Sequence, residues 1–195
     1  GRPVPAVFAT GYRKDGWCKE RNGLCGLMSA PADLKELLGF LGIRNDSHVV
    51  LAARGKSATD MGFATRIYWT FKVLGHDKIS ILNGGMKAYL DDFANPTSIQ
   101  SRRPIPKRYR ANPHHELIAK EAAIKAALAS GGVKLFDHRP LTQYLGKKKS
   151  KVVKKYGTIP GAVSKPASQL TKAGGGIFKT AKELKMSFQS ASGAN

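Results

Sequence analysis

Two short apolar runs enclose a helical segment, and this arrangement restricts the fold more than any other feature of the sequence. Residues 48–53 and 78–82 are rich in β-branched side chains, and each run has the length of one buried strand. Between them, apolar residues recur at helical spacing from Phe63 to Leu74, and Gly75 ends the segment. A strand, a helix and a strand in this order predict parallel strands covered by helices, so we expect an α/β fold.

The chain before the first strand contains an irregular stretch followed by a helix. Residues 1–27 are rich in glycine and are expected to be extended chain and loop. A helix is expected at residues 30–41, with Ser29 as its N-cap. Thr59 or Asp60 is expected to cap the helix between the two strands. The aromatic side chains of that second helix are assigned to the core: Tyr68, Trp69 and Phe71.

A basic, proline-rich stretch divides the chain into two units. Residues 94–113 contain four prolines and five Lys or Arg residues, a composition typical of a linker. We therefore expect a first domain at residues 1–100, a linker at 101–113 and a second domain at 114–195. A helix at 118–128 followed by a strand and a last helix extends the α/β pattern into the second unit.

The two units share an internal similarity. Residues 33–35, within the first helix, resemble residues 183–185, which lie 150 positions later. The same offset places the counterpart of the strand at 48–53 near position 203, past Asn195. The first unit, in turn, has no counterpart of the helix and strand at residues 116–137. We therefore expect two repeats that are both incomplete, the first at its start and the second in its later half.

Three motif-bearing stretches follow one another in a characteristic order. Residues 64–85 contain the second helix, the next strand and a Gly-Gly turn, and residues 135–146 and 157–162 carry the other two motifs. In order and spacing these stretches resemble the tandem-domain rhodaneses, sulfurtransferases that use thiosulfate or 3-mercaptopyruvate. The resemblance implies a rhodanese-like fold, with parallel sheets flanked by helices. Tyr89 stands where the family usually has Trp, and Gln143 where an acidic residue or Arg is common, which affects substrate specificity more than fold.

The resemblance also implies a reaction. A rhodanese moves sulfane sulfur from a small anionic donor to a thiophilic acceptor such as cyanide through a cysteine persulfide, without a metal or an organic cofactor. Its thiolate lies in a loop between strand and helix, where backbone N–H groups stabilise negative charge. In the first unit this position falls at Ala53 and Arg54, and in the second it falls past Asn195. No catalytic residue is therefore assigned, and we expect the chain to be inactive alone.

Two cysteines in 195 residues exclude a disulfide scaffold and fit a reducing compartment, such as the cytoplasm or the mitochondrial matrix. Cys18 and Cys25 form no C-x-x-C pair and have no zinc-ligand pattern around them, so we interpret them as incidental or buried thiols. The alternative, a functional thiol at Cys18, stays open. No signal peptide is visible, and no apolar run approaches the ~18–20 residues of a membrane span, so no membrane partner is expected.

Asp137 and Arg139 are the best site candidates, because they follow the strand of the second unit. The resemblance implies an anion-facing role for Arg139 near the active-site cleft, toward the sulfur donor. An Arg–Asp pair that only fixes the end of the strand is the alternative. His138 is interpreted as a strand-end residue. The basic loop at residues 54–57 precedes a helix and could also hold an anion, which would suit a regulatory anion-binding module.

Positive charge is the outlier of the composition. Lys and Arg number 33 against 13 Asp and Glu, which gives a formal net charge of +20. The densest basic run comprises Lys147, Lys148, Lys149, Lys151, Lys154 and Lys155. One interpretation is a solvated loop, and the other is a site for RNA or another polyanion, bound by charge attraction. The second interpretation gives an alternative function, a non-enzymatic basic adaptor in an RNA-rich assembly. The sequence leaves the oligomeric state open.

Overall fold

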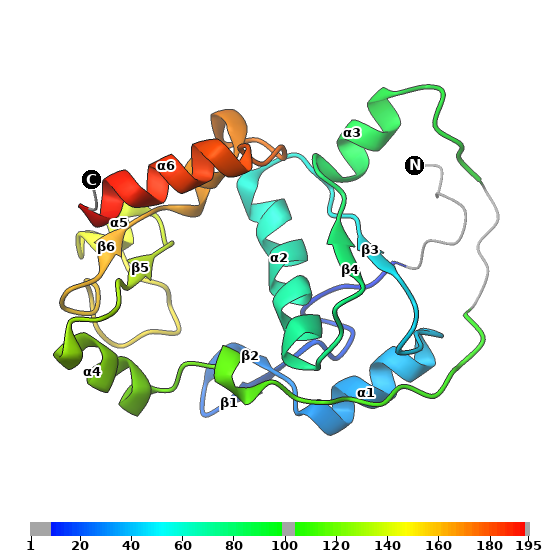
Figure 1. The fold of residues 1–195 in the computed structure, drawn as a ribbon, viewed down its shortest axis with the longest axis horizontal. Coiled ribbons are helices and arrows are strands. Elements are labelled where there is room, and N and C mark those ends of the chain that lie inside the picture. The colour runs from blue at the N-terminus through cyan, green and yellow to red at the C-terminus, as the bar shows by residue number, and fades with distance from the viewer. Residues whose placement is uncertain (1–8, 99–103, 194–195) are drawn as a thin grey trace.

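The computed structural model describes residues 9–98 and 104–193 of the chain (Figure 1). The elements of the first half are β1 (Cys18–Arg21), β2 (Leu24–Met28), α1 (Pro31–Phe40), β3 (Val49–Leu51), α2 (Ala58–Val73), β4 (Ile79–Ile81) and α3 (Gly85–Asp91). β3 and β4 pair in parallel, with Val49 opposite Ile79, and α2 connects them and packs against both. The expected strand–helix–strand unit and the α/β fold are confirmed.

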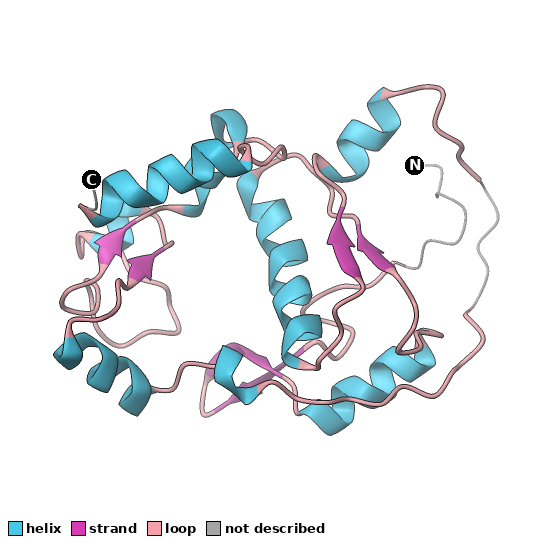
Figure 2. Cartoon of the chain, in the orientation of Figure 1, coloured by secondary structure: helices cyan, strands magenta, loops and turns pink. Residues whose placement is uncertain are grey.

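The second half repeats the parallel pairing on a smaller scale. Its elements are η1 (His115–Leu117), α4 (Glu121–Ser130), β5 (Phe136–Asp137), α5 (Leu141–Tyr144), β6 (Val163–Ser164), η2 (Ala167–Leu170), η3 (Lys172–Gly174) and α6 (Ala181–Ser192). β5 and β6 are parallel, with Phe136 opposite Val163, and Figure 2 shows the two parallel pairs as separate sheets. α1 begins at Pro31 and α6 at Ala181, in agreement with the repeat offset of 150.

The hairpin of β1 and β2 lies in a stretch that was expected to be irregular. That expectation is wrong because Asn22 and Gly23 both adopt positive φ angles, 51° and 74°. Two such residues make the turn that matches the twist of a β-hairpin, and Asn-Gly is its commonest sequence. Arg66 of α2 holds the hairpin in place, because its Nε donates to the hydroxyl of Tyr12 at 3.0 Å and its Nη2 to the carbonyl of Gly26 at 3.3 Å.

Both helix starts differ from the expected caps. Ser29 is not the N-cap of α1, because its hydroxyl donates to the carbonyl of Gly16 at 2.7 Å, and α1 begins after Ala30 without a side-chain cap. α2 is capped by Ser57, whose hydroxyl accepts from the amide of Asp60 at 3.2 Å. The expected caps, Thr59 and Asp60, lie inside the helix, and the extended backbone is that of Ser57.

The main core lies between α1, α2 and β4. Phe71 is fully buried, as expected, whereas Tyr68 and Trp69 are only half-buried. Trp69 does not belong to the core cluster, and its indole donates to the carbonyl of Leu117 at 3.1 Å. Phe63, at the start of the helical apolar pattern, is 43% exposed. The buried cluster consists of Trp17, Leu34, Leu38, Ile67, Phe71, Leu74, Ile79 and Tyr109.

The proline-rich stretch packs along α1 and α2 where it is described. The amide of Lys107 donates to the carbonyl of Gly39 at 2.8 Å, and that of Asn112 to the carbonyl of Leu74 at 3.0 Å. Between them, Tyr109 enters the core with 3% of its surface exposed. The first part of the expected linker (101–103), both ends of the expected first domain (1–8 and 99–100) and the end of the second (194–195) lie outside the described residues. The division into domains stays a prediction.

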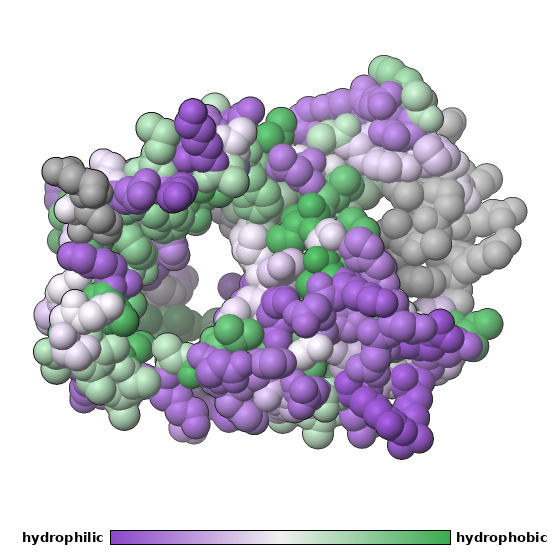
Figure 3. Space-filling model, viewed as in Figure 1, coloured by the Kyte–Doolittle hydropathy of each residue, from purple (hydrophilic) through white to green (hydrophobic). Residues whose placement is uncertain are grey.

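The two halves meet at glycine-rich turns. The amide of Gly84 donates to the carbonyl of Gly176 at 3.1 Å, and the amide of Phe178 donates to Oδ1 of Asn83 at 2.8 Å. A Cβ atom on Gly176 would lie 1.9 Å from the carbonyl oxygen of Gly55, so a larger residue does not fit. Figure 3 shows an opening between α2 and the half that carries β5 and β6. Within the described ranges, no helix has the length and apolarity to cross a membrane.

Candidate functional site

The loop between β3 and α2 contains Ala53 and Arg54, the position to which the resemblance assigned the strand-to-helix loop of the first unit. Its carbonyls face the start of α3, because Ala53 accepts from the amide of Met86 at 2.7 Å and Arg54 from that of Lys87 at 3.0 Å. The carboxylate of Asp60 accepts a hydrogen bond from the backbone amide of Lys56 at 3.1 Å, so this amide already has a partner within the protein. Arg54 and Lys56 are exposed. The loop can offer positive charge to an anion, but it contains no thiol.

The strand end of the second half carries a buried carboxylate. The side chain of Asp137, at the end of β5, is only 8% exposed. It accepts from Nε of Arg139 at 2.9 Å, from the backbone amide of Arg139 at 3.0 Å and from the hydroxyl of Thr158 at 2.7 Å. These bonds, first that of the Arg139 guanidinium and then that of Thr158, hold the pKa of Asp137 well below its usual range. The same pair raises the pKa of Arg139.

Arg139 connects this carboxylate to the motif at residues 157–162. Its Nη2 donates both to Asp137 and to the carbonyl of Gly157, the latter at 2.8 Å. The hydroxyl of Tyr144 donates to the carbonyl of Ala162 at 3.0 Å and ties the same stretch to α5. The structure therefore contains the Arg–Asp pair that fixes the strand end. The guanidinium is still 38% exposed, and an anion-binding role for Arg139 and Asp137 stays a prediction.

His138 has the structural surroundings expected of a strand-end residue. Its Nδ1 lies 2.6 Å from the carbonyl oxygen of Lys165, and its ring packs against Phe136 and Phe188. Lys165 itself is 6% exposed, and its ammonium group donates to Ser187 of α6. Neither Lys165 nor Thr158 was singled out in the sequence. Thr158 belongs to a recognised motif, whereas nothing in the sequence marks Lys165 as buried.

Both cysteines are free, and both belong to the N-terminal hairpin. Cys18 is half-buried, with its Sγ 3.4 Å from the carbonyl oxygen of Tyr12, and Cys25 is exposed. Neither follows a parallel strand at the start of a helix, where a nucleophilic thiol of this fold is expected. Among residues 9–98 and 104–193, no group of three or more His, Cys, Asp or Glu side chains could hold a metal ion.

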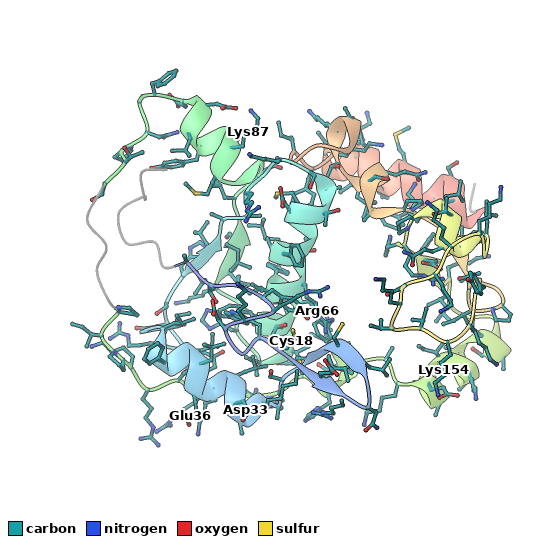
Figure 4. The ribbon with its side chains drawn as sticks, turned by 180° about the vertical axis from the view of Figure 1, so that it is seen from behind. Cys18, Asp33, Glu36, Arg66, Lys87 and Lys154 are labelled. Carbon is teal, nitrogen blue, oxygen red and sulfur yellow. The ribbon has the colours of Figure 1, made fainter. Side chains whose placement is uncertain are left out.

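The basic run forms an exposed loop between α5 and β6. All six of its lysines are exposed, and none takes part in an ion pair with any described residue. Nζ of Lys149 donates to the carbonyl of Val153 at 3.0 Å and lies 5.6 Å from the ring centre of Tyr156. Figure 4 places Lys154 in this loop, far from the acidic residues Asp33 and Glu36 of α1. The six lysines that are close in the sequence therefore also share one exposed loop in the structure.

Sequence comparison identifies sulfurtransferases as relatives, although no protein-family model matches the chain. Thiosulfate sulfurtransferase of Mus musculus is 32% identical over 168 residues, which cover 84% of this chain and 54% of that protein. 3-Mercaptopyruvate sulfurtransferase of Homo sapiens is 29% identical over 157 residues, which cover 79% of this chain and 51% of that protein. The chain spans about half the length of the curated relatives it matches.

Solved structures agree with these relatives in fold. The 3-mercaptopyruvate sulfotransferase SseA of Escherichia coli, described as a rhodanese fold, is 22% identical with a TM-score of 0.67, covering 84% of this chain and 59% of its own. The Tum1 protein of Saccharomyces cerevisiae is 18% identical with a TM-score of 0.76, covering 98% of this chain and 66% of its own. Motifs, relatives and fold agree, so the chain has a rhodanese-like fold and is similar along most of its length to thiosulfate and 3-mercaptopyruvate sulfurtransferases.

Proposed function

We propose that the protein moves sulfane sulfur from thiosulfate or 3-mercaptopyruvate to a thiophilic acceptor such as cyanide. The observation that carries this proposal is the 32% identity to mouse thiosulfate sulfurtransferase along 84% of the chain. With thiosulfate, a cysteine thiolate attacks the outer sulfur, the S–S bond breaks and sulfite leaves with the electron pair. Cyanide then takes the outer sulfur from the persulfide, which forms thiocyanate and restores the thiolate.

In this proposal the described residues build the frame of the site. Asp137, Thr158 and Arg139 fix the end of β5 against the stretch that begins at Gly157. The exposed part of the Arg139 guanidinium is the group that we assign to the anionic donor. Neither cysteine lies in a strand-to-helix loop, so we place the nucleophile outside residues 1–195.

The test combines a sulfur-transfer assay with the intact mass of the protein isolated from its source. We expect thiocyanate from thiosulfate and cyanide, with loss of turnover after alkylation of one thiol. A native protein that transfers no sulfur from either donor would overturn the proposal. For the chain of residues 1–195 alone we expect no thiocyanate above buffer. Turnover by this chain that Cys18→Ser or Cys25→Ser abolishes would contradict our assignment of these thiols as non-catalytic.

A second candidate function is a non-enzymatic, basic adaptor that binds RNA or another polyanion in a larger assembly. It is supported by six exposed lysines without an acidic partner in the described structure and by the formal net charge of +20. The same transfer assay separates the two candidates, because an adaptor has no turnover. For either candidate we infer a reducing compartment, cytoplasm or mitochondrial matrix, which the two free cysteines support.

A further inference from the structure

The basic loop, residues 147–156, is held in a defined place. The amides of Lys147 and Lys148 both donate to the carbonyl of Thr142, each at 2.9 Å. After the loop, the carbonyl of Gly157 accepts from Arg139 at 2.8 Å. The loop is therefore tied at both ends to the frame around β5, while its lysine side chains extend into solvent. A partner would meet a fixed group of positive charges.

The charge of the basic loop has no neutralising partner among the described residues of its half. Residues 112–195 contain four acidic residues, and each is engaged elsewhere. Exposed charges interact over a Debye length of about 8–10 Å in physiological salt, so a concentrated positive field surrounds the loop. The four acids and their partners are Glu116 with His114, Glu121 with Lys125, Asp137 with Arg139, and Glu183 with Thr180.

The side chains of the basic loop fit one class of partner. Ammonium groups are compact charges that suit phosphate oxygens, and six of them within nine positions match a repeating polyanion. The lysines lie in irregular backbone, not on a helix that could enter the groove of a duplex. Tyr156 is 62% exposed and provides a ring on which an unpaired base can stack. We propose that the basic loop binds single-stranded nucleic acid through its phosphates, with Tyr156 stacking on a base.

The surface can be tested apart from sulfur transfer, because its lysines take no part in the bonds around Asp137. The probe is a fluorescein-labelled oligouridylate of twenty nucleotides, and its anisotropy is measured with the chain of residues 1–195. About six phosphate contacts to a single strand give a slope of roughly −4 in a plot of log Kobs against log salt. We therefore expect binding to weaken on the order of a few hundredfold between about 50 and 200 mM NaCl.

Two variants that lose the same number of positive charges test whether nucleic acid binds at the basic loop or is attracted by the positive charge of the whole protein. The first replaces five lysines of the basic loop by Gln and keeps Lys149, because Lys149 bonds to Val153. We expect it to bind about tenfold or more weakly, with a salt slope flatter by about 3. The control replaces five exposed lysines elsewhere and should bind within about threefold of wild type. The loop variant changes Lys147, Lys148, Lys151, Lys154 and Lys155, and the control changes Lys120, Lys134, Lys172, Lys182 and Lys185.

Tyr156→Leu tests the stacking contact. We expect about fivefold weaker binding of the oligouridylate and unchanged binding of inorganic polyphosphate, which has no bases. Equal losses in the loop and control variants would overturn the proposal, as would binding that is insensitive to salt. Tighter binding to a DNA duplex of equal length, or to phosphatidylserine vesicles, would also overturn it. Loss of nucleic-acid binding with intact sulfur transfer in the native protein would leave the proposed enzyme function in place.

Discussion

At the scale of single residues, burial separates two Arg–Asp pairs that look alike in the sequence. Asp137 and Arg139 are two positions apart, and so are Arg44 and Asp46. The carboxylate of Asp137 is 8% exposed and has Thr158 as an additional donor, whereas that of Asp46 is 63% exposed. Solvent screens the second pair, so only the first should contribute measurably to stability.

We expect Asp137→Asn to lower the free energy of unfolding by about 2 kcal/mol, because charge-assisted hydrogen bonds to the carboxylate are lost. Asp46→Asn is the matched control and should change it by less than about 0.5 kcal/mol. Urea denaturation of both variants at pH 7 measures the difference. Equal effects would mean that burial does not distinguish the pairs.

The same carboxylate predicts a pH dependence. The pKa of Asp137 is lowered in the fold by the Arg139 guanidinium and by Thr158, whereas an unfolded chain titrates near ~3.9. Its stabilising contribution is therefore present above about pH 4 and is lost as the pH falls toward the folded-state pKa. The difference in the free energy of unfolding between wild type and Asp137→Asn should therefore become smaller below about pH 4. A gap of constant size from pH 7 to pH 3 would contradict this account.

Tyr109 presents the opposite case, a buried polar group without a partner among the described residues. Its hydroxyl is buried and meets no hydrogen-bond partner in residues 9–98 and 104–193, and burial raises its pKa to about 12. We expect Tyr109→Phe to leave stability unchanged or to raise it by up to about 1 kcal/mol, because an unsatisfied hydroxyl is removed. Tyr109→Ala should lower stability by about 3–5 kcal/mol through the cavity it leaves. Thermal unfolding of both variants measures the contrast, and destabilisation by Tyr109→Phe would reveal a hidden partner.

At the scale of elements, the contact between the two halves depends on backbone approaching backbone. We expect Gly176→Ala to destabilise the protein by about 1–3 kcal/mol, because its Cβ would lie 1.9 Å from the carbonyl oxygen of Gly55. Gly132→Ala is the control, since its nearest neighbour would be an ordinary 3.7 Å away. The rate of limited proteolysis within residues 172–178 measures whether this stretch still contacts the first half of the chain. Equal cleavage of Gly176→Ala and wild type would mean that this loop does not need the contact.

Periodic elements could be predicted from the sequence, and their ends could not. Short runs rich in β-branched residues identified β3 and β4, and apolar spacing identified α2. The burial expected for the first strand is not observed, because β3 contains no fully buried residue. The starts of α1 and α2 were not predictable in this way. Ser29 does not cap α1 because its hydroxyl bonds to the distant carbonyl of Gly16, and Ser57 caps α2 because its backbone is extended; apolar periodicity carries no information on either point. The β1–β2 hairpin had a local signal in Asn22 and Gly23, but no apolar alternation accompanied it.

The candidate site was predictable where a motif was local. Asp137 and Arg139 are neighbours in the sequence, and their pairing follows from that proximity. Thr158 bonds to Asp137 from twenty-one positions away, and the buried Lys165 bonds to Ser187 of α6, twenty-two positions away. Such contacts depend on tertiary packing, for which a single sequence gives no direct signal.

At the scale of the whole molecule, a formal net charge of +20 opposes compaction. We expect Tm to rise by about 3 °C or more between low and moderate NaCl, because salt screens the repulsion between like charges. Replacing five lysines of the basic loop by Gln should raise Tm at low salt and reduce its salt dependence. Differential scanning calorimetry measures both effects. A Tm that falls with added NaCl would mean that the ion pairs outweigh the net repulsion.

The glycine contact between the halves also bears on how the chain is made. Asn83 receives its bond from Phe178 across ninety-five positions of sequence. During synthesis from the N-terminus, the turn at Gly84 emerges from the ribosome long before Gly176 does. The first half must therefore leave its Asn83 and Gly84 contacts unmade until the stretch that contains Gly176 and Phe178 has been synthesised.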